Sequence, residues 1–161
     1  MKTGDIIACR GNRLISRLIM AFTKSKYSHV SVALAIHDDI YIVEMQHAGC
    51  DLISLDNWIK KYNYKYEVYR PVDPVSLKLI LSKASTTKYD LRSLFLRQPL
   101  KIIKERITGK KSTLRKVKNE DSKMTCSEYV AWLYEIEDYY DMTPDDVVKE
   151  CLDRGYELVK E

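Results

Sequence analysis

The 161-residue sequence has little of what marks several common protein classes. Five glycines and four prolines are too few for a collagen-like or linker-rich chain, and no segment is low-complexity or repeated. The cysteines lie too far apart for a zinc-binding or redox pair; they are Cys9, Cys50, Cys126 and Cys151. We therefore expect no metal site and no cofactor.

Long apolar runs are also absent. The start, MKTGDIIACRGN, carries charges too early for a signal peptide, which favours the cytoplasm and reduced thiols. The most apolar segment, LISRLIMAF at 14–22, contains an arginine and is less than half of the roughly 20 residues that a membrane span needs. We expect it to form a helix that faces the core. With 45% hydrophobic and 31% charged residues, the sequence predicts one soluble globular domain over 1–161.

Positive charge is concentrated in one segment. Arg97–Lys118 holds nine Lys or Arg and one Glu, so this segment carries +8 while the whole chain carries +4. The rest of the chain is therefore slightly acidic. We expect a basic insertion or loop at about 97–122, either a solvated loop or a surface for an anionic partner such as a membrane, a nucleic acid or an acidic cell-wall polymer.

Apolar periodicity predicts an α+β domain, with an antiparallel sheet of about four to six strands and helices packed on it. A hairpin of 28–36 and 40–46 is the strongest strand signal. Helix starts are indicated by Asn12, by Asp73 with Pro74, and by Thr143 with Pro144. The remaining expected elements are strands at 4–10, 50–55, 64–71 and 156–160 and helices at 54–62 and 125–137.

Cys126 stands where a helix is expected to begin. Thr125 and Glu128 form the T-x-x-E pattern of a capping box, which places Cys126 in the first turn. Free amides and the positive end of the helix dipole stabilise a thiolate there. The alternative is that Cys126 is only the first apolar residue of a core stripe. The other three cysteines have no histidine or charge pattern around them, which is typical of buried or incidental thiols.

Three histidines are available as a base for this cysteine. His37 lies in the expected hairpin turn and should be exposed, whereas His29 begins a strand. The hairpin places His29 beside the segment 44–47, where Glu44, Gln46 or His47 could accept its second N–H. Periodicity does not choose among the three, because a shift of one residue exchanges the faces of a strand.

Six short motifs resemble, in order, those of the circularly permuted NlpC-type papain-like cysteine hydrolases, the YiiX and YebB group. They are GDII, SHVSVAL, IYIVEMQHAGC, KYDLRSLF, TCSEYV and TPDDV, and they extend from about Gly4 to Val147. The resemblance implies a permuted papain-like fold in which an antiparallel sheet packs against a cysteine-bearing helix. It also implies Cys126 as nucleophile, His29 as general base, Glu44 as the orienting residue and Tyr89 as possible support. The chain departs from the family where TTK replaces a common glycine and proline before Tyr89.

The activity that this resemblance implies is acyl transfer through a thioester. The substrate would be an amide bond of a peptide or of a cell-wall peptide (a peptidoglycan fragment), or a lipid acyl bond. The alternative from another class is a non-catalytic module that binds an anionic surface through Arg97–Lys118.

Overall fold

The computed structural model describes residues 1–46, 48–89, 98–109, 123–137 and 139–160. Within them lies a six-stranded antiparallel sheet in the order β4-β3-β2-β1-β5-β8. Its strands are β1 (Ile6–Arg10), β2 (His29–Ile36), β3 (Asp39–Gln46), β4 (Gly49–Ser54), β5 (Lys65–Arg70) and β8 (Glu157–Lys160). A small second sheet pairs β6 (Lys88–Tyr89) in parallel with β7 (Lys123–Met124).

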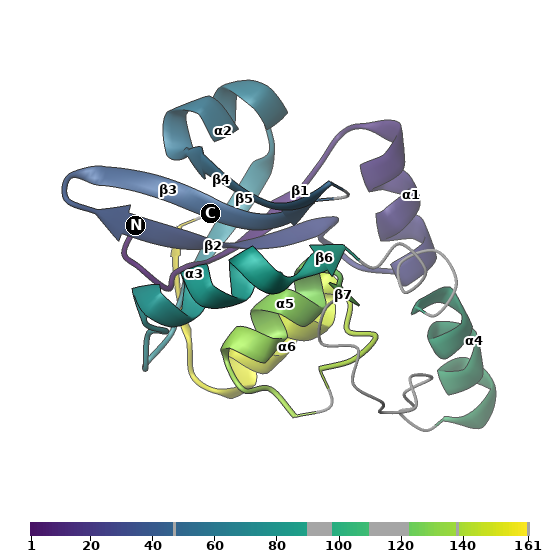
Figure 1. The fold of residues 1–161 in the computed structure, drawn as a ribbon. Coiled ribbons are helices and arrows are strands. Elements are labelled where there is room, and N and C mark those ends of the chain that lie inside the picture. The colour runs from purple at the N-terminus through teal and green to yellow at the C-terminus, as the bar shows by residue number, and fades with distance from the viewer. Residues whose placement is uncertain (47, 90–97, 110–122, 138, 161) are drawn as a thin grey trace.

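Helices cover both faces of the large sheet (Figure 1). One face packs against α2 (Leu55–Tyr62), and the opposite face packs against α3 (Leu77–Thr86), α5 (Cys126–Leu133) and α6 (Pro144–Asp153). Strand alternation explains the division: in β1, Ile7 joins the core on the α2 side while Ile6 and Ala8 join the larger core against α5. The predicted α+β class, with a sheet packed on the cysteine-bearing helix, is confirmed.

The predicted hairpin is formed by β2 and β3. Val32 faces Val43 and Ala33 faces Ile42 across the two strands. The turn contains His37, which is exposed and has a positive φ of 53°, as expected for a tight connection. This register decides which side chains of β3 share a face with His29.

Two of the predicted helix starts are confirmed and two are wrong. Thr125 caps α5 and Thr143 caps α6, each in a full capping box. By contrast, α3 begins at Leu77, because the hydroxyl of Ser76 accepts the backbone N–H of Leu79. Asp73 and Pro74 therefore precede the helix. The helix α1 (Leu14–Thr23) follows Arg13, not Asn12, and has no side-chain cap.

The prediction that α1 faces the core is wrong. Leu14 is 74% exposed and Phe22 58%, and the buried residues of this helix are Ser16 and Thr23. The close approach of Ser16 to Gly11 explains this orientation, since a Cβ on Gly11 would meet the Ser16 hydroxyl. Small polar residues thus form the inner face, and the apolar stripe lies outside.

The basic segment is helical over its first half. Its residues 98–108 form α4 (Gln98–Thr108), which lies beside α1 at one end of the molecule (Figure 1). The part of the expected loop at 110–122 lies outside the described residues, as do Arg97 and the side chain of Tyr89. No helix in the described part of the chain is long and apolar enough to cross a membrane.

Candidate functional site

His29 and Glu44 meet across the hairpin. The β2–β3 register puts odd-numbered residues of β2 on the same face as even-numbered residues of β3. His29 Nε2 lies 2.9 Å from Glu44 Oε2. Of the three residues that periodicity left open, Glu44 thus contacts the imidazole. Gln46 shares its face and helps to lower the pKa of Glu44, and His47 lies outside the described residues.

The carboxylate of Glu44 is fully buried and is held by two ring N–H groups. Besides His29, the indole Nε1–H of Trp58 in α2 donates to the same oxygen at 3.1 Å. Burial alone would raise the pKa of Glu44, but the hydrogen bond and charge of His29, and then the indole, lower it below its usual range. Glu44 is therefore a charged acceptor that fixes the ring of His29.

Cys126 occupies the first turn of α5 and is 4% exposed. Because Nε2 of His29 is engaged by Glu44, Nδ1 is the ring nitrogen left to hydrogen-bond the thiol. Burial opposes ionisation, yet the charge and hydrogen bond of His29 lower the pKa of Cys126. Burial likewise opposes the imidazolium, but Cys126 and then Glu44 raise the pKa of His29 to about 10. These directions describe a thiolate–imidazolium pair.

The pKa values of the other three cysteines shift in the opposite direction. Burial, followed by the charges of Glu44 and Cys126, raises the pKa of Cys9 well above its usual value. Burial also raises the pKa of Cys50 to about 11 and that of Cys151 to about 12. Cys126 is thus the one cysteine of the four whose pKa is lowered.

Trp58 is the residue of this arrangement that sequence reasoning missed. It lies 14 positions after Glu44 and on another element, so no local spacing connects them. The available signal was its indole N–H, since a buried tryptophan generally needs a hydrogen-bond acceptor.

Glu128 has a role beyond the capping box. Its Oε1 accepts the backbone N–H of Asp141 at 2.8 Å, which ties the start of α5 to the chain that leads into α6.

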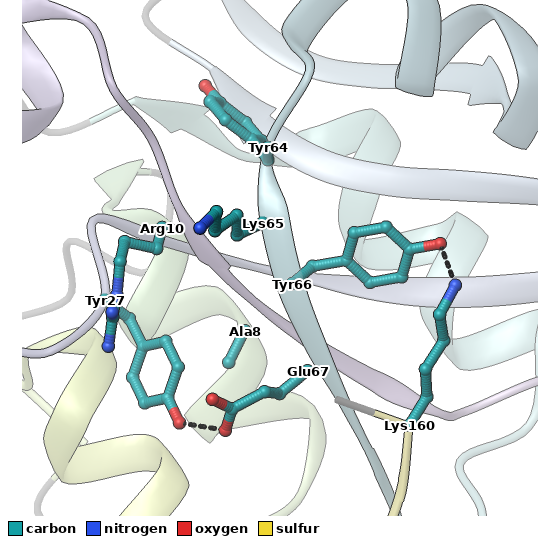
Figure 2. A pocket seen from close by; sticks show the side chains of 8 residues that line it. All are labelled: Ala8, Arg10, Tyr27, Tyr64, Lys65, Tyr66, Glu67 and Lys160. Carbon is teal, nitrogen blue, oxygen red and sulfur yellow. Dashed lines mark hydrogen bonds between the residues drawn. The ribbon is translucent and has the colours of Figure 1, made fainter.

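A pocket of about 390 Å³ lies elsewhere, along β1 and β5. Figure 2 shows its tyrosines and cations, with Glu67 accepting a hydrogen bond from Tyr27. Neither Cys126, His29 nor Glu44 lines it. The described residues also contain no group of three His, Cys, Asp or Glu placed to hold a metal ion.

Comparison with known proteins gives distant structural likenesses, and these show the fold alone. No protein-family profile and no curated protein sequence matches this chain. Among solved structures, it is similar to the crystal structure of metalloprotein YiiX from Escherichia coli O157:H7, at 22% sequence identity and a TM-score of 0.49. The matched region covers 83% of this chain and 64% of the YiiX chain, so the chain spans less than two thirds of that protein.

Proposed function

We propose that the protein is a cysteine hydrolase of the permuted papain-like type, formed by residues 1–161 as one domain with a basic insertion. Cys126 is the nucleophile, His29 the general base and Glu44 the positioning residue. The observation that carries the proposal is the contact of His29 Nε2 with Glu44 Oε2 at 2.9 Å, together with the pKa of Cys126, which the charge and hydrogen bond of His29 lower. A nucleophile, a base and a group that orients the base are the parts that this chemistry requires.

The reaction proceeds in two acyl transfers. The Cys126 thiolate attacks the carbonyl carbon of an amide or ester, and the imidazolium of His29 gives its proton to the leaving nitrogen or oxygen as the C–N or C–O bond breaks. The acyl group is then a thioester on Cys126. Neutral His29 next takes a proton from water, the hydroxide attacks the thioester, and the acid product leaves with Cys126 again a thiolate.

The start of α5 offers a place for the developing oxyanion. Cys126 is the first residue of the helix, and the first amides of a helix have no intrahelical carbonyl partner. Its backbone N–H, beside its own Sγ, is suited to donate to the carbonyl oxygen as negative charge grows there. The capping box fixes this turn, because Thr125 and Glu128 exchange hydrogen bonds at 3.3 and 2.8 Å.

Labelling with a biotinylated iodoacetamide at pH 6 tests this proposal, because ionisation and exposure rank the cysteines differently. Cys50 is partly exposed and Cys126 is buried, so exposure alone makes Cys50 react first. We expect Cys126 to react about tenfold faster or more, since thiolate fraction changes tenfold for each pKa unit. Mass spectrometry of the tryptic peptides measures both rates. Faster reaction of Cys50 would contradict an activated Cys126.

Matched variants assign the effect to the three residues. His29→Ala and Glu44→Gln should slow Cys126 labelling at pH 6, and Cys50→Ala should leave it unchanged. A substrate screen follows, in which the protein is tested against peptide, cell-wall peptide and lipid ester probes. Cys126→Ala is its inactive control. The alternative, a non-catalytic module that binds an anionic surface, predicts equal labelling in wild type and in His29→Ala.

A further inference from the structure

The outward apolar stripe of α1 has no role in the proposed chemistry. Leu14, Leu18 and Phe22 recur every four residues on one side of this helix, and Leu18 is 42% exposed. The neighbouring α4 has a second stripe, formed by Leu100, Ile103 and Ile107, and Ile107 is 80% exposed. We call these six side chains the docking face. Exposed apolar residues gathered on two adjacent helices mark an interaction surface.

The docking face lies at the end of the sheet that holds the candidate site. Helix α1 connects the end of β1 to the start of β2, and the first residue of β2 is His29. Cys9, next to the end of β1, is paired with His29. Helix α5, which begins with Cys126, starts directly after β7 on the same side of the molecule (Figure 1).

Positive charge surrounds the docking face. Between Asp5 and Asp38 the sequence has five Lys or Arg and no acidic residue. Arg17 and Lys24 beside the stripe of α1 are exposed and have no acidic partner among the described residues. Lys104 and Arg106 are exposed on α4. Apolar residues bordered by Lys and Arg on a short helix are the pattern of helices that lie in the surface of an anionic bilayer.

Two other occupants fit this combination less well. A second copy of the chain would bring two strongly basic surfaces together, which like-charge repulsion opposes. A nucleic acid would pair with the cations but would leave six apolar side chains facing a phosphate backbone. An anionic bilayer satisfies both features, since its headgroups meet the cations and its acyl region takes the apolar side chains.

We infer that α1 and α4 dock the protein on the surface of a membrane rich in anionic phospholipid, with the candidate site facing the lipid. The docking goes beyond the proposed hydrolase activity and does not depend on it. If both hold, the substrate of Cys126 is presented at the bilayer surface, which favours a lipid acyl ester or a membrane-bound peptide over a freely diffusing one.

Vesicle co-sedimentation of the full chain tests the inference. We expect binding to phosphatidylcholine vesicles with about 30% phosphatidylserine, and weak binding to phosphatidylcholine alone. The triple variant Leu14→Ser/Leu18→Ser/Phe22→Ser should bind about tenfold less tightly or worse. The triple variant Arg17→Gln/Lys24→Gln/Lys104→Gln should bind about a hundredfold less tightly, since each cation near an anionic surface contributes about a factor of five.

A matched control replaces three exposed apolar residues elsewhere, Leu52→Ser/Val72→Ser/Leu152→Ser, and should bind like wild type. Cys126→Ala should also bind like wild type, which separates a failure of docking from a failure of catalysis. Equal binding of wild type to both vesicle types, or equal loss in the control and the α1 variant, overturns the inference. So does a wild-type dimer in sedimentation velocity that the α1 variant abolishes without any vesicle binding, because that result assigns the face to a second copy.

Discussion

At the scale of single residues, the lowered pKa of Cys126 depends on its partners and not on its exposure. Cys126 is buried, as Cys9 and Cys151 are, yet its pKa is lowered while theirs are raised. The difference is His29, whose charge is supported in turn by Glu44. Residues that hold Glu44 should therefore influence the thiol without touching it.

Trp58 is the residue that tests this influence. Trp58→Phe keeps an aromatic ring in the core but removes the N–H donated to the Glu44 carboxylate. We expect a loss of about 1.5–3 kcal/mol in unfolding free energy, the usual value for a hydrogen bond to a charged group, measured by urea denaturation. We also expect the midpoint of Cys126 labelling against pH to move upward, since a less firmly held Glu44 stabilises the imidazolium less.

Trp132→Phe on α5 is the control for this prediction. Its ring lies under the ammonium of Lys83 at 4.2 Å and is not bonded to Glu44. The prediction fails if both variants leave the labelling midpoint of wild type unchanged.

At the scale of elements, the start of α5 joins stability to the candidate site. Thr125→Ala removes the capping hydroxyl and should cost about 1 kcal/mol in unfolding free energy. Thr143→Ala removes the equivalent hydroxyl from α6 and should cost about the same. We expect slower Cys126 labelling at pH 6 in the first variant alone, because only that cap fixes the turn that holds the thiol. Equal labelling in the two variants would show that the cap is structural only.

Elements also show what the sequence could and could not predict. The capping box of α5 involves residues three apart, so the sequence contained it in full. The predicted hairpin placed His29 beside residues 44–47. The residues alone could not select Glu44 among them, because that choice depends on the register of the two strands. The stripe of α1 was recognised, but periodicity shows only that one face is apolar and not whether that face is covered. For α3, both Asp73 and Ser76 are residue types that cap helices, and a local pattern does not decide which of the two begins the helix.

At the scale of the whole molecule, Glu67 connects the chain entering β2 to β5. Burial alone would raise its pKa, but hydrogen bonds from Lys26, Tyr27 and Tyr69 hold the pKa of Glu67 at about 2. Figure 2 shows the bond from Tyr27. A lowered pKa contributes stability that is fully present above the unfolded value, about 4.3, and is lost as pH falls toward 2.

We therefore expect Glu67→Gln to lower the melting temperature by a constant amount between pH 5 and pH 8, measured by circular dichroism. The difference from wild type should shrink below about pH 4.5. Glu137→Gln, which changes an exposed carboxylate, is the control. A difference that does not change with pH would show that packing, and not charge, explains the effect of the substitution.

The order of the strands along the chain has a consequence for biosynthesis. Five of the six strands of the large sheet, together with Trp58, precede Cys126, which follows His29 by 97 positions. The ribosome therefore synthesises His29, Glu44 and Trp58 before it reaches Cys126. Cys126, the proposed nucleophile, is the last of these residues to be synthesised. A nascent chain therefore has no thiol of lowered pKa until α5 can pack on a sheet that lacks only its final edge strand.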